Sequence, residues 1–271
     1  MKILVTGWTG GLGKYVIEAL KDHTLILPQS REALNLLSPN SIISYIDRIK
    51  PERIVHLGAI ANVDYCEDHP EEAVVINSLS TAIICSKMPF GSVIFMSTND
   101  VFSGYSFPGP YGKITPTPTN VYSWTKFASE CSVLSSGGLI IRANFFTRKC
   151  KSKQSFAEYV ISGLRAGQKT RCYSNIFNSP VFAGTIADTI AMVVRENRRS
   201  GILHVACSEG ISRFDFAISI AKAYSLDTGL IVNTKLTESE KRGRPLDARI
   251  TSDIINISLD NEIRKMKDAE L

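Results

Sequence analysis

Residues 2–20, KILVTGWTGGLGKYVIEAL, decide the fold of this 271-residue chain. The apolar run KILVT has the composition of a buried strand, and the segment that follows has the spacing of a helix. Gly7, Gly10 and Gly13 lie at the junction between the two. Glycine there permits a tight turn, a close approach of backbone to a pyrophosphate and close packing of helix on strand, while the amides at the helix start attract anions. The stretch predicts a dinucleotide-binding loop, with Leu12 among its contacts.

Short apolar runs alternate with segments of helical spacing through the first half of the chain. Helix start signals occur at Ser38-Pro39, His69-Pro70 and Asn120. Because strands that are apolar throughout and alternate with helices indicate a parallel sheet covered on both faces, we predict a doubly wound α/β (Rossmann) fold. The expected strands are 2–6, 24–27, 53–57, 92–96 and 138–141, and the expected helices are about 11–22, 39–50, 70–87 and 120–135.

The regular alternation ends near residue 146. We expect residues 1–146 to form the dinucleotide-binding domain, with a later return segment near 184–206, and residues 147–271 to form mainly a smaller substrate-binding lobe with a helix near 153–166. Ligands of open α/β sheets bind at the carboxyl ends of the strands, so the lobe should cover that edge.

Composition excludes several classes of protein. The chain is 44% hydrophobic and carries 31 basic and 26 acidic residues, a net charge of +5. The basic residues are scattered, apart from short clusters at 148–153 and 241–244, and do not form the long stripe of a nucleic-acid groove. No signal segment or membrane-spanning run is evident, so we expect a cytoplasmic protein with neither nucleic-acid nor membrane partners.

The cysteines and histidines are dispersed along the chain. Without a CxxC pair we expect free thiols in a reducing compartment and no metal site. His56 and His204 lie in strand-like runs and are interpreted as core or strand-end residues. The six cysteines are Cys66, Cys85, Cys131, Cys150, Cys172 and Cys207.

The end of the second strand bears on the choice of dinucleotide. An acidic residue there would hold the ribose hydroxyls of NAD, whereas LILPQSRE offers Arg31 before Glu32. An arginine can form a forked, charge-assisted pair with the 2′-phosphate of NADP. We therefore predict NADP, with NAD as the alternative if Arg31 is only a solvated loop residue.

Tyr122 and Lys126 lie four residues apart in NVYSWTKFASE, which has helical composition. That spacing places both side chains on one helix face. We expect the ammonium, with the positive charge of a nicotinamide, to lower the phenol pKa from about 10 into the range useful for general acid catalysis. Thr98 or Ser97, at the end of the preceding strand, could donate a hydrogen bond to the same substrate oxygen.

In this order along the chain, these motifs resemble the extended short-chain dehydrogenase/reductase family, most of all its dTDP-4-dehydrorhamnose reductase (RmlD-like) branch. The resemblance covers nearly the whole chain and is strongest in TGWTGGLG (6–13), residues 31–81, MSTNDVFSG (96–104), NVYSWTK (120–126), LIIRANFF (139–146), residues 176–194, residues 201–223 and GRPLDARITSD (243–253).

The resemblance implies roles for individual residues. Thr98, Tyr122 and Lys126 would be the catalytic trio, with Lys126 also holding the nicotinamide ribose. Gly58 and Ala59 would pass along the cofactor, and Asn77 would support the cofactor side from its helix. The candidate substrate contacts are Ser97, Asp64, Asp100, Phe145 and Arg244, although a solvated basic loop would explain Arg244 equally well.

The chain also departs from the branch. It reads STNDVF where the branch usually reads STDYVF, and Phe145 replaces a usual tryptophan. Related 4,6-dehydratases carry an acid in place of Asn99, so dehydration is disfavoured, although Asp100 could serve as a base.

The function expected from the sequence is NADPH-dependent reduction of a keto group on a nucleotide-linked deoxysugar. The alternatives are an epimerase or 4,6-dehydratase with tightly bound NAD(P), and a non-catalytic regulatory subunit. A homodimer is possible on the same resemblance, but no segment identifies its interface.

Overall fold

A computed structural model describes residues 1–103, 109–148, 154–198, 200–255 and 257–269. Its centre is a six-stranded sheet in which every neighbouring pair is parallel. The strand order is β10-β5-β4-β3-β1-β2. The strands are β1 Lys2–Thr6, β2 Thr24–Ile26, β3 Arg53–His56, β4 Val93–Met96, β5 Leu139–Arg142 and β10 Gly201–His204.

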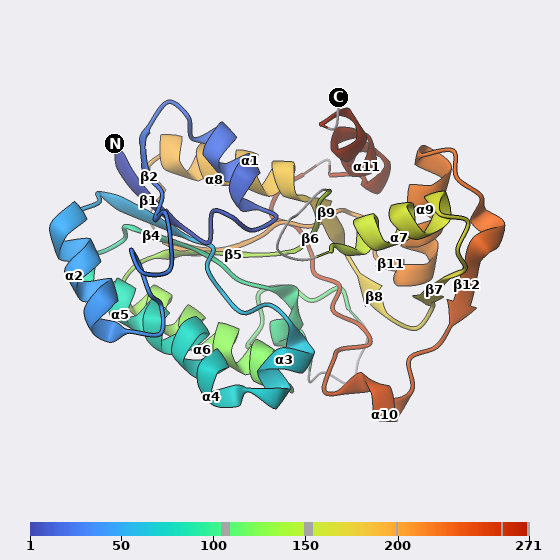
Figure 1. Cartoon of the computed structure of the whole chain (residues 1–271), viewed down its shortest axis with the longest axis horizontal. Coiled ribbons are helices and arrows are strands. Elements are labelled where there is room, and N and C mark those ends of the chain that lie inside the picture. The colour runs from blue at the N-terminus through green and yellow to red at the C-terminus, as the bar shows by residue number, and fades with distance from the viewer. Residues whose placement is uncertain (104–108, 149–153, 199, 256, 270–271) are drawn as a thin grey trace.

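Helices cover both faces of this sheet, which confirms the doubly wound fold. In Figure 1, α1 and α8 lie on one face and α2, α5 and α6 on the other. Strands β3, β4 and β5 are buried along their whole length, as expected of strands covered on both sides. These helices are α1 Gly13–Ala19, α2 Pro39–Ile49, α5 Ser80–Lys87, α6 Val121–Ser135 and α8 Ala183–Arg195.

The start signals in the sequence act as predicted. Ser38 caps α2 by accepting a hydrogen bond from the Ser41 amide. Asn120 forms a capping box with Ser123 at the start of α6, which fixes the turn that carries Tyr122. The expected helix 70–87 is interrupted: α4 Pro70–Ala73 leads into the π-helical segment η1 Val74–Leu79 before α5 begins.

The strand order reverses between β1 and β3, which are neighbours in the sheet although β2 separates them along the chain. At such a switch point the loops after the two strands diverge and leave a crevice at the carboxyl ends. The glycine loop follows β1, and Gly58 and Ala59 follow β3. The fold therefore brings the two segments predicted to hold the cofactor to one place.

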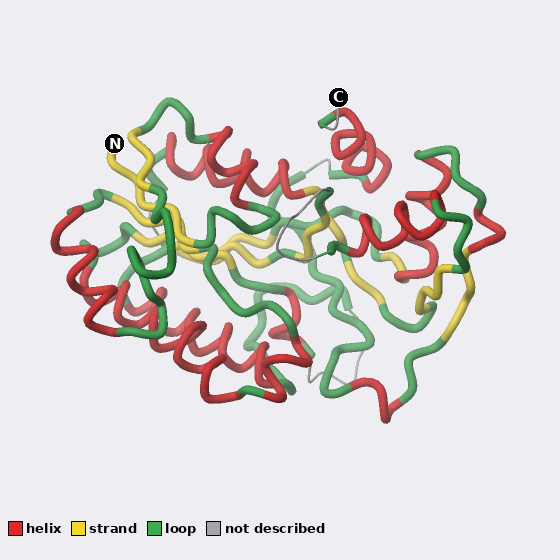
Figure 2. Tube along the Cα trace, viewed as in Figure 1, coloured by secondary structure: helices red, strands yellow, loops and turns green. Residues whose placement is uncertain are grey.

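The later part of the chain forms a lobe beyond the carboxyl ends of the strands. Figure 2 shows that this lobe consists of short strands and helices joined by long stretches of loop. Its small sheets pair β6 with β9, β7 with β12 and β8 with β11. The strands are β6 Asn144–Phe146, β7 Thr170–Tyr173, β8 Phe177–Asn178, β9 Pro180–Phe182, β11 Ile211–Ser212 and β12 Ile231–Thr234. The remaining helices are α3 Val63–Asp68, α7 Phe156–Arg165, α9 Arg213–Ala223, α10 Glu238–Lys241 and α11 Leu259–Asp268, with 3-10 turns η2 Asn99–Phe102 and η3 Thr228–Leu230.

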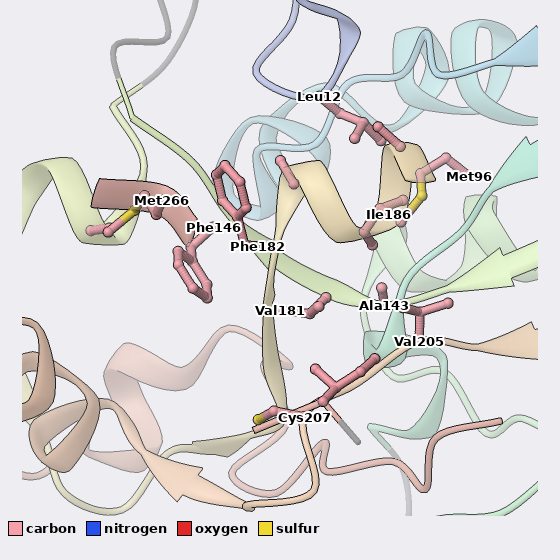
Figure 3. Packing of buried hydrophobic residues seen from close by; sticks show 14 of the residues in the cluster. Leu12, Met96, Ala143, Phe146, Val181, Phe182, Ile186, Val205, Cys207 and Met266 are labelled. Carbon is pink, nitrogen blue, oxygen red and sulfur yellow. The ribbon is translucent and has the colours of Figure 1, made fainter. Parts of the chain in front are cut away.

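One hydrophobic cluster runs from the sheet into the lobe. Figure 3 shows Leu12 and Met96 from the sheet side in the same cluster as Phe146, Val181 and Met266. The segment 183–204 returns to the sheet, because α8 packs on α1 and β10 pairs with β5. On this basis we propose that residues 1–146 and this return segment form the dinucleotide-binding part, and that most of 147–271 forms the substrate lobe.

Candidate active site

The glycine loop is built as its sequence requires. Gly7 has φ +65°, and a Cβ there would lie 2.5 Å from the Gly58 amide nitrogen. A Cβ at Gly13 would lie 1.9 Å from the Trp8 carbonyl oxygen, so Gly13 serves packing of α1 against the loop. Gly10, whose Cβ would meet only the Gly7 carbonyl oxygen at 3.2 Å, has open space beside it. These glycines leave a backbone cradle that side chains would otherwise fill.

A cavity of about 890 Å³ lies between the carboxyl ends of the strands and the lobe. Its lining residues come from many segments of the chain, from the glycine loop to the C-terminal basic loop. The predicted residues that line it are Gly7, Gly10, Leu12, Ala59, Asp64, Ser97, Thr98, Asp100, Tyr122, Lys126, Phe145 and Arg244.

Tyr122 and Lys126 both line this cavity from α6, one helical turn apart. Lys126 is only 3% exposed. Its ammonium donates a hydrogen bond of 2.8 Å to the Met96 carbonyl oxygen and lies 4.0 Å from the centre of the Phe95 ring. The lysine is therefore held against the end of β4, in the same cavity that the Tyr122 phenol lines.

The predicted lowering of the phenol pKa is wrong for the protein by itself. Burial raises the pKa of Tyr122, the nearby carboxylate of Asp100 raises it further, and a hydrogen bond with Thr98 opposes only part of the rise. Burial also lowers the pKa of Lys126 to about 7, against the opposing effect of Glu130. The net shift of the phenol is opposite to the predicted one, because the effect of burial is larger than that of the Thr98 hydrogen bond.

Thr98 and Ser97 have different surroundings. Thr98 caps the turn η2, where its hydroxyl accepts a hydrogen bond of 3.1 Å from the Asp100 amide and also bonds to Tyr122. Ser97 donates a hydrogen bond of 2.6 Å to Glu130 Oε1. Of the two predicted hydroxyls, Thr98 is the one coupled to the phenol.

A buried ion pair behind the site was missed by the sequence analysis. Arg142 Nε and Nη2 donate to the two carboxylate oxygens of Glu130 at 2.8 and 2.6 Å, and the two side chains are 2% and 1% exposed. The same carboxylate accepts the Ser97 hydrogen bond and opposes the lowering of the Lys126 pKa by burial. Glu130 follows Lys126 by four residues, a spacing that places it on the same helix face and was the available signal.

Asp64 and Arg244 were predicted separately, and the structure pairs them. Arg244 Nη2 lies 2.6 Å from Asp64 Oδ2, and Arg242 Nη2 lies 2.5 Å from Asp68 Oδ1. These contacts join the basic loop after α10 to α3 at the rim of the cavity. Asp64 is therefore engaged by a second predicted substrate residue.

Four predicted cofactor residues do not line the cavity, and Gly13, which packs against Trp8, is one of them. Arg31 is exposed in the loop after β2. Gly58 packs against Gly7, and its amide donates to Thr6 Oγ1 at 3.2 Å. Asn77 is buried in η1, accepts from the Ile60 amide at 2.8 Å and donates to Thr125 Oγ1 at 3.0 Å, so it supports the loop after β3 from behind.

Asn99 and the histidines have structural surroundings. Asn99 is fully buried, and its amide donates to Asn178 Oδ1 at 2.9 Å and to the Ala248 carbonyl oxygen at 2.7 Å, which ties η2 to the lobe. His56 and His204 are buried in the sheet, and burial lowers their pKa values to about 3 and about 4. Cys150 and residues 149–153 of the predicted basic cluster lie outside the described residues, and the other five cysteines are free thiols.

Within the described ranges, no three His, Cys, Asp or Glu side chains gather as they would around a metal ion. No described helix has the length and apolar character needed to cross a bilayer.

Comparison with known proteins places the chain in a family. The model of the RmlD substrate binding domain matches residues 1–269. The chain is 27% identical over 238 residues to dTDP-4-dehydrorhamnose reductase of Burkholderia thailandensis, covering 83% of this chain and 78% of that one. It is 25% identical over 270 residues to methionine adenosyltransferase 2 subunit beta of Danio rerio, covering 92% of this chain and 82% of that one.

A solved structure has the same fold. The dTDP-4-dehydrorhamnose reductase of Bacillus anthracis, in complex with NADP, aligns with a TM-score of 0.89 at 20% identity over 99% of both chains. Because the family model spans almost the whole sequence, the chain belongs to the RmlD substrate-binding domain family, which confirms the predicted oxidoreductase class, the extended short-chain dehydrogenase/reductases.

Proposed function

We propose that this protein reduces a keto group on a nucleotide-linked deoxysugar with NADPH, in the manner of dTDP-4-dehydrorhamnose reductase. One observation carries the proposal: Tyr122, Lys126 and Thr98 line the same cavity as the glycine loop, at the switch point of the sheet. A phenol, an ammonium and a hydroxyl beside a dinucleotide cradle are the groups that carbonyl reduction needs.

The cradle fits a dinucleotide. The open backbone at Gly10 suits a pyrophosphate. Ala59 lines the same cavity, and so does Lys126 of the trio. When bound, the reduced nicotinamide supplies a hydride to the keto carbon. NADP is favoured by Arg31, a cation free to turn toward a 2′-phosphate on the exposed loop after β2, and by the NADP complex of the Bacillus anthracis reductase.

The residues of the chain manage the proton. Because its pKa is raised, the Tyr122 phenol keeps its proton at neutral pH and donates it to the carbonyl oxygen as that oxygen gains charge. Thr98, already bonded to the phenol, orients the same oxygen. Burial lowers the pKa of Lys126 to about 7 and the Glu130 carboxylate opposes that effect, so the lysine is partly protonated at neutral pH and then supplies positive charge on the cavity wall.

Epimerisation and dehydration are less well supported. A 4,6-dehydratase needs an acid at position 99, and the Asn99 side chain is instead committed to Asn178 and Ala248. Asp100 lines the cavity and remains a candidate base for either reaction. The difference that separates these reactions from a reductase is the source of the reducing equivalents. Those reactions regenerate their cofactor within one turnover, whereas a reductase consumes it.

A regulatory role is the third candidate, and the likeness to methionine adenosyltransferase 2 subunit beta favours testing it. A chain that only binds a partner enzyme has no requirement for the trio on the cavity wall. The trio is complete here, which supports catalysis.

The test is a turnover assay with purified protein, NADPH and dTDP-4-dehydro-6-deoxysugars. We expect one NADPH to be oxidised for each sugar reduced. Conversion of a nucleotide sugar without net NADPH oxidation would replace the proposal by an epimerase or dehydratase. Binding of dinucleotide without conversion of any sugar, together with binding to a methionine adenosyltransferase catalytic subunit, would replace it by the regulatory role.

A further inference from the structure

Arg213 is a charged residue of the cavity wall that lies outside the catalytic trio and the glycine loop. It is the first residue of α9, where its amide donates to the Ile176 carbonyl oxygen at 2.9 Å and Ser212 caps the helix. Its guanidinium carbon lies 5.9 Å from the centre of the Phe156 ring, which stacks on Phe216. The side chain is thus supported by aromatic rings of the lobe and lines the same cavity as Tyr122 and Lys126.

The guanidinium of Arg213 forms no hydrogen bond or ion pair with any residue that the structure describes. The guanidinium nitrogens of Arg213 are not fully buried, so its five donors are open to the cavity and available to a ligand. Burial lowers the pKa of Arg213, the Asp100 carboxylate opposes that effect, and the charge of Arg244 adds to it. Both arginines line the same cavity, and an anion bound between them would relieve their mutual repulsion.

We propose that Arg213 and Arg244 together bind the diphosphate of the substrate, with Arg213 as the principal contact. Arg244 is already oriented by Asp64 at 2.6 Å, which fixes one edge of its guanidinium. Two guanidinium groups suit a diphosphate because each can form paired, charge-assisted hydrogen bonds to phosphate oxygens.

The inference rests on the proposed function for the identity of its ligand, a nucleoside diphosphate joined to a sugar. The other phosphate source would be the dinucleotide. Arg213 belongs to the lobe, and its charged neighbours are Asp100 and Arg244, whereas the cradle for the dinucleotide phosphates lies at the glycine loop after β1. The position therefore favours the substrate.

The test is calorimetric titration of the full-length protein with dTDP, UDP and NADP, using Arg213→Gln and Arg213→Lys. Arg171→Gln is the matched control, because Arg171 is an exposed arginine of the same lobe and does not line the cavity. We expect Arg213→Gln to raise the Kd of the better-binding nucleoside diphosphate roughly 10- to 100-fold. Arg213→Lys should give a smaller rise, because lysine keeps the charge without the fork. The Kd of NADP should stay within about twofold in every variant, which also shows that the variants are folded.

An unchanged nucleoside diphosphate Kd in Arg213→Gln would overturn the inference, as would no binding of dTDP or UDP to the wild-type protein. A rise confined to NADP would assign Arg213 to the cofactor instead. Failure of the proposed function gives a different pattern: nucleoside diphosphate binding would depend on Arg213, but no keto sugar would be reduced.

Discussion

Replacing Glu130 by glutamine tests the buried ion pair behind the trio. The change keeps the shape of the side chain but removes the charge that faces Arg142, which is 2% exposed and has both of its nearer nitrogens bonded to this carboxylate. Neutralising one partner of a buried ion pair lowers the free energy of unfolding by about 3–5 kcal/mol. The glutamine side chain can still accept one hydrogen bond from Arg142, so we expect a loss at the lower end of this range, about 3 kcal/mol. For a chain of this size that corresponds to a fall in Tm of roughly 6–12 °C.

The measurement is urea-induced unfolding at pH 7, followed by circular dichroism, with the thermal midpoint as a second readout. Glu18→Gln is the matched control, because Glu18 pairs with Lys21 at 2.7 Å on the open surface. The control should leave stability unchanged within error. A loss in Glu130→Gln no larger than in Glu18→Gln would refute the reasoning that this carboxylate compensates a buried guanidinium.

Three further predictions concern the cofactor-free protein. Lys126 has a pKa of about 7 in the folded protein and a higher pKa in the unfolded chain, so the unfolded state binds more protons above pH 7 and this group should make stability rise between pH 7 and pH 10. Urea unfolding at pH 7 and pH 9 should show a larger gain in stability for the wild-type protein than for Lys126→Met, and equal gains would contradict the assignment. Burial lowers the His56 pKa to about 3, so this residue contributes stability that is complete above about pH 6.5 and is lost as the pH falls toward 3. The stability of His56→Gln should depend less steeply on pH during acid unfolding, and a pH profile equal to that of the wild type would count against a neutral buried imidazole. Gly13→Ala places a Cβ 1.9 Å from the Trp8 carbonyl oxygen and should destabilise the protein by about 1–3 kcal/mol. Gly112→Ala is the control, because its Cβ would have no atom within 4 Å and the substitution should change stability little. Equal unfolding midpoints for the two variants would disprove the close packing of α1 on the glycine loop.

The fold was predictable because its signals are local. The apolar strands, the glycines after β1 and the caps at Ser38 and Asn120 each act within a few residues, and the structure contains them where they were expected. Conversion of part of the expected helix 70–87 into the π-helical segment Val74–Leu79 was not predictable. That segment buries Asn77, whose partners Ile60 and Thr125 belong to other elements.

The electrostatics of the site could not be predicted from spacing. A separation of four residues places Tyr122 and Lys126 on one face, but the sign of each pKa shift depends on how much water the fold removes and on groups from other strands. Burial dominates both shifts, and Met96 from β4 takes the lysine hydrogen bond. Only the oxidised nicotinamide is positively charged, and its charge would lower the phenol pKa.

Contacts between residues on different elements were also hidden from the sequence analysis. Glu130 and Arg142 lie on α6 and β5, and their pairing follows from the packing of helix on sheet. Arg213, the first residue of α9 in the lobe, lines the same cavity as Tyr122 and Lys126 of α6. No sequence period connects such residues, so their proximity appears only in three dimensions.

The central claim is that the phenol of Tyr122 is the proton donor beside the bound dinucleotide. Its most direct test is single-turnover oxidation of NADPH by Tyr122→Phe in the presence of the keto sugar, with Tyr159→Phe, an exposed tyrosine on α7, as control. We predict that Tyr122→Phe binds NADPH like the wild type but oxidises it at least about 100-fold more slowly, since general acid catalysis contributes roughly 10²–10⁴-fold. A rate for Tyr122→Phe within tenfold of the Tyr159→Phe rate would contradict the claim.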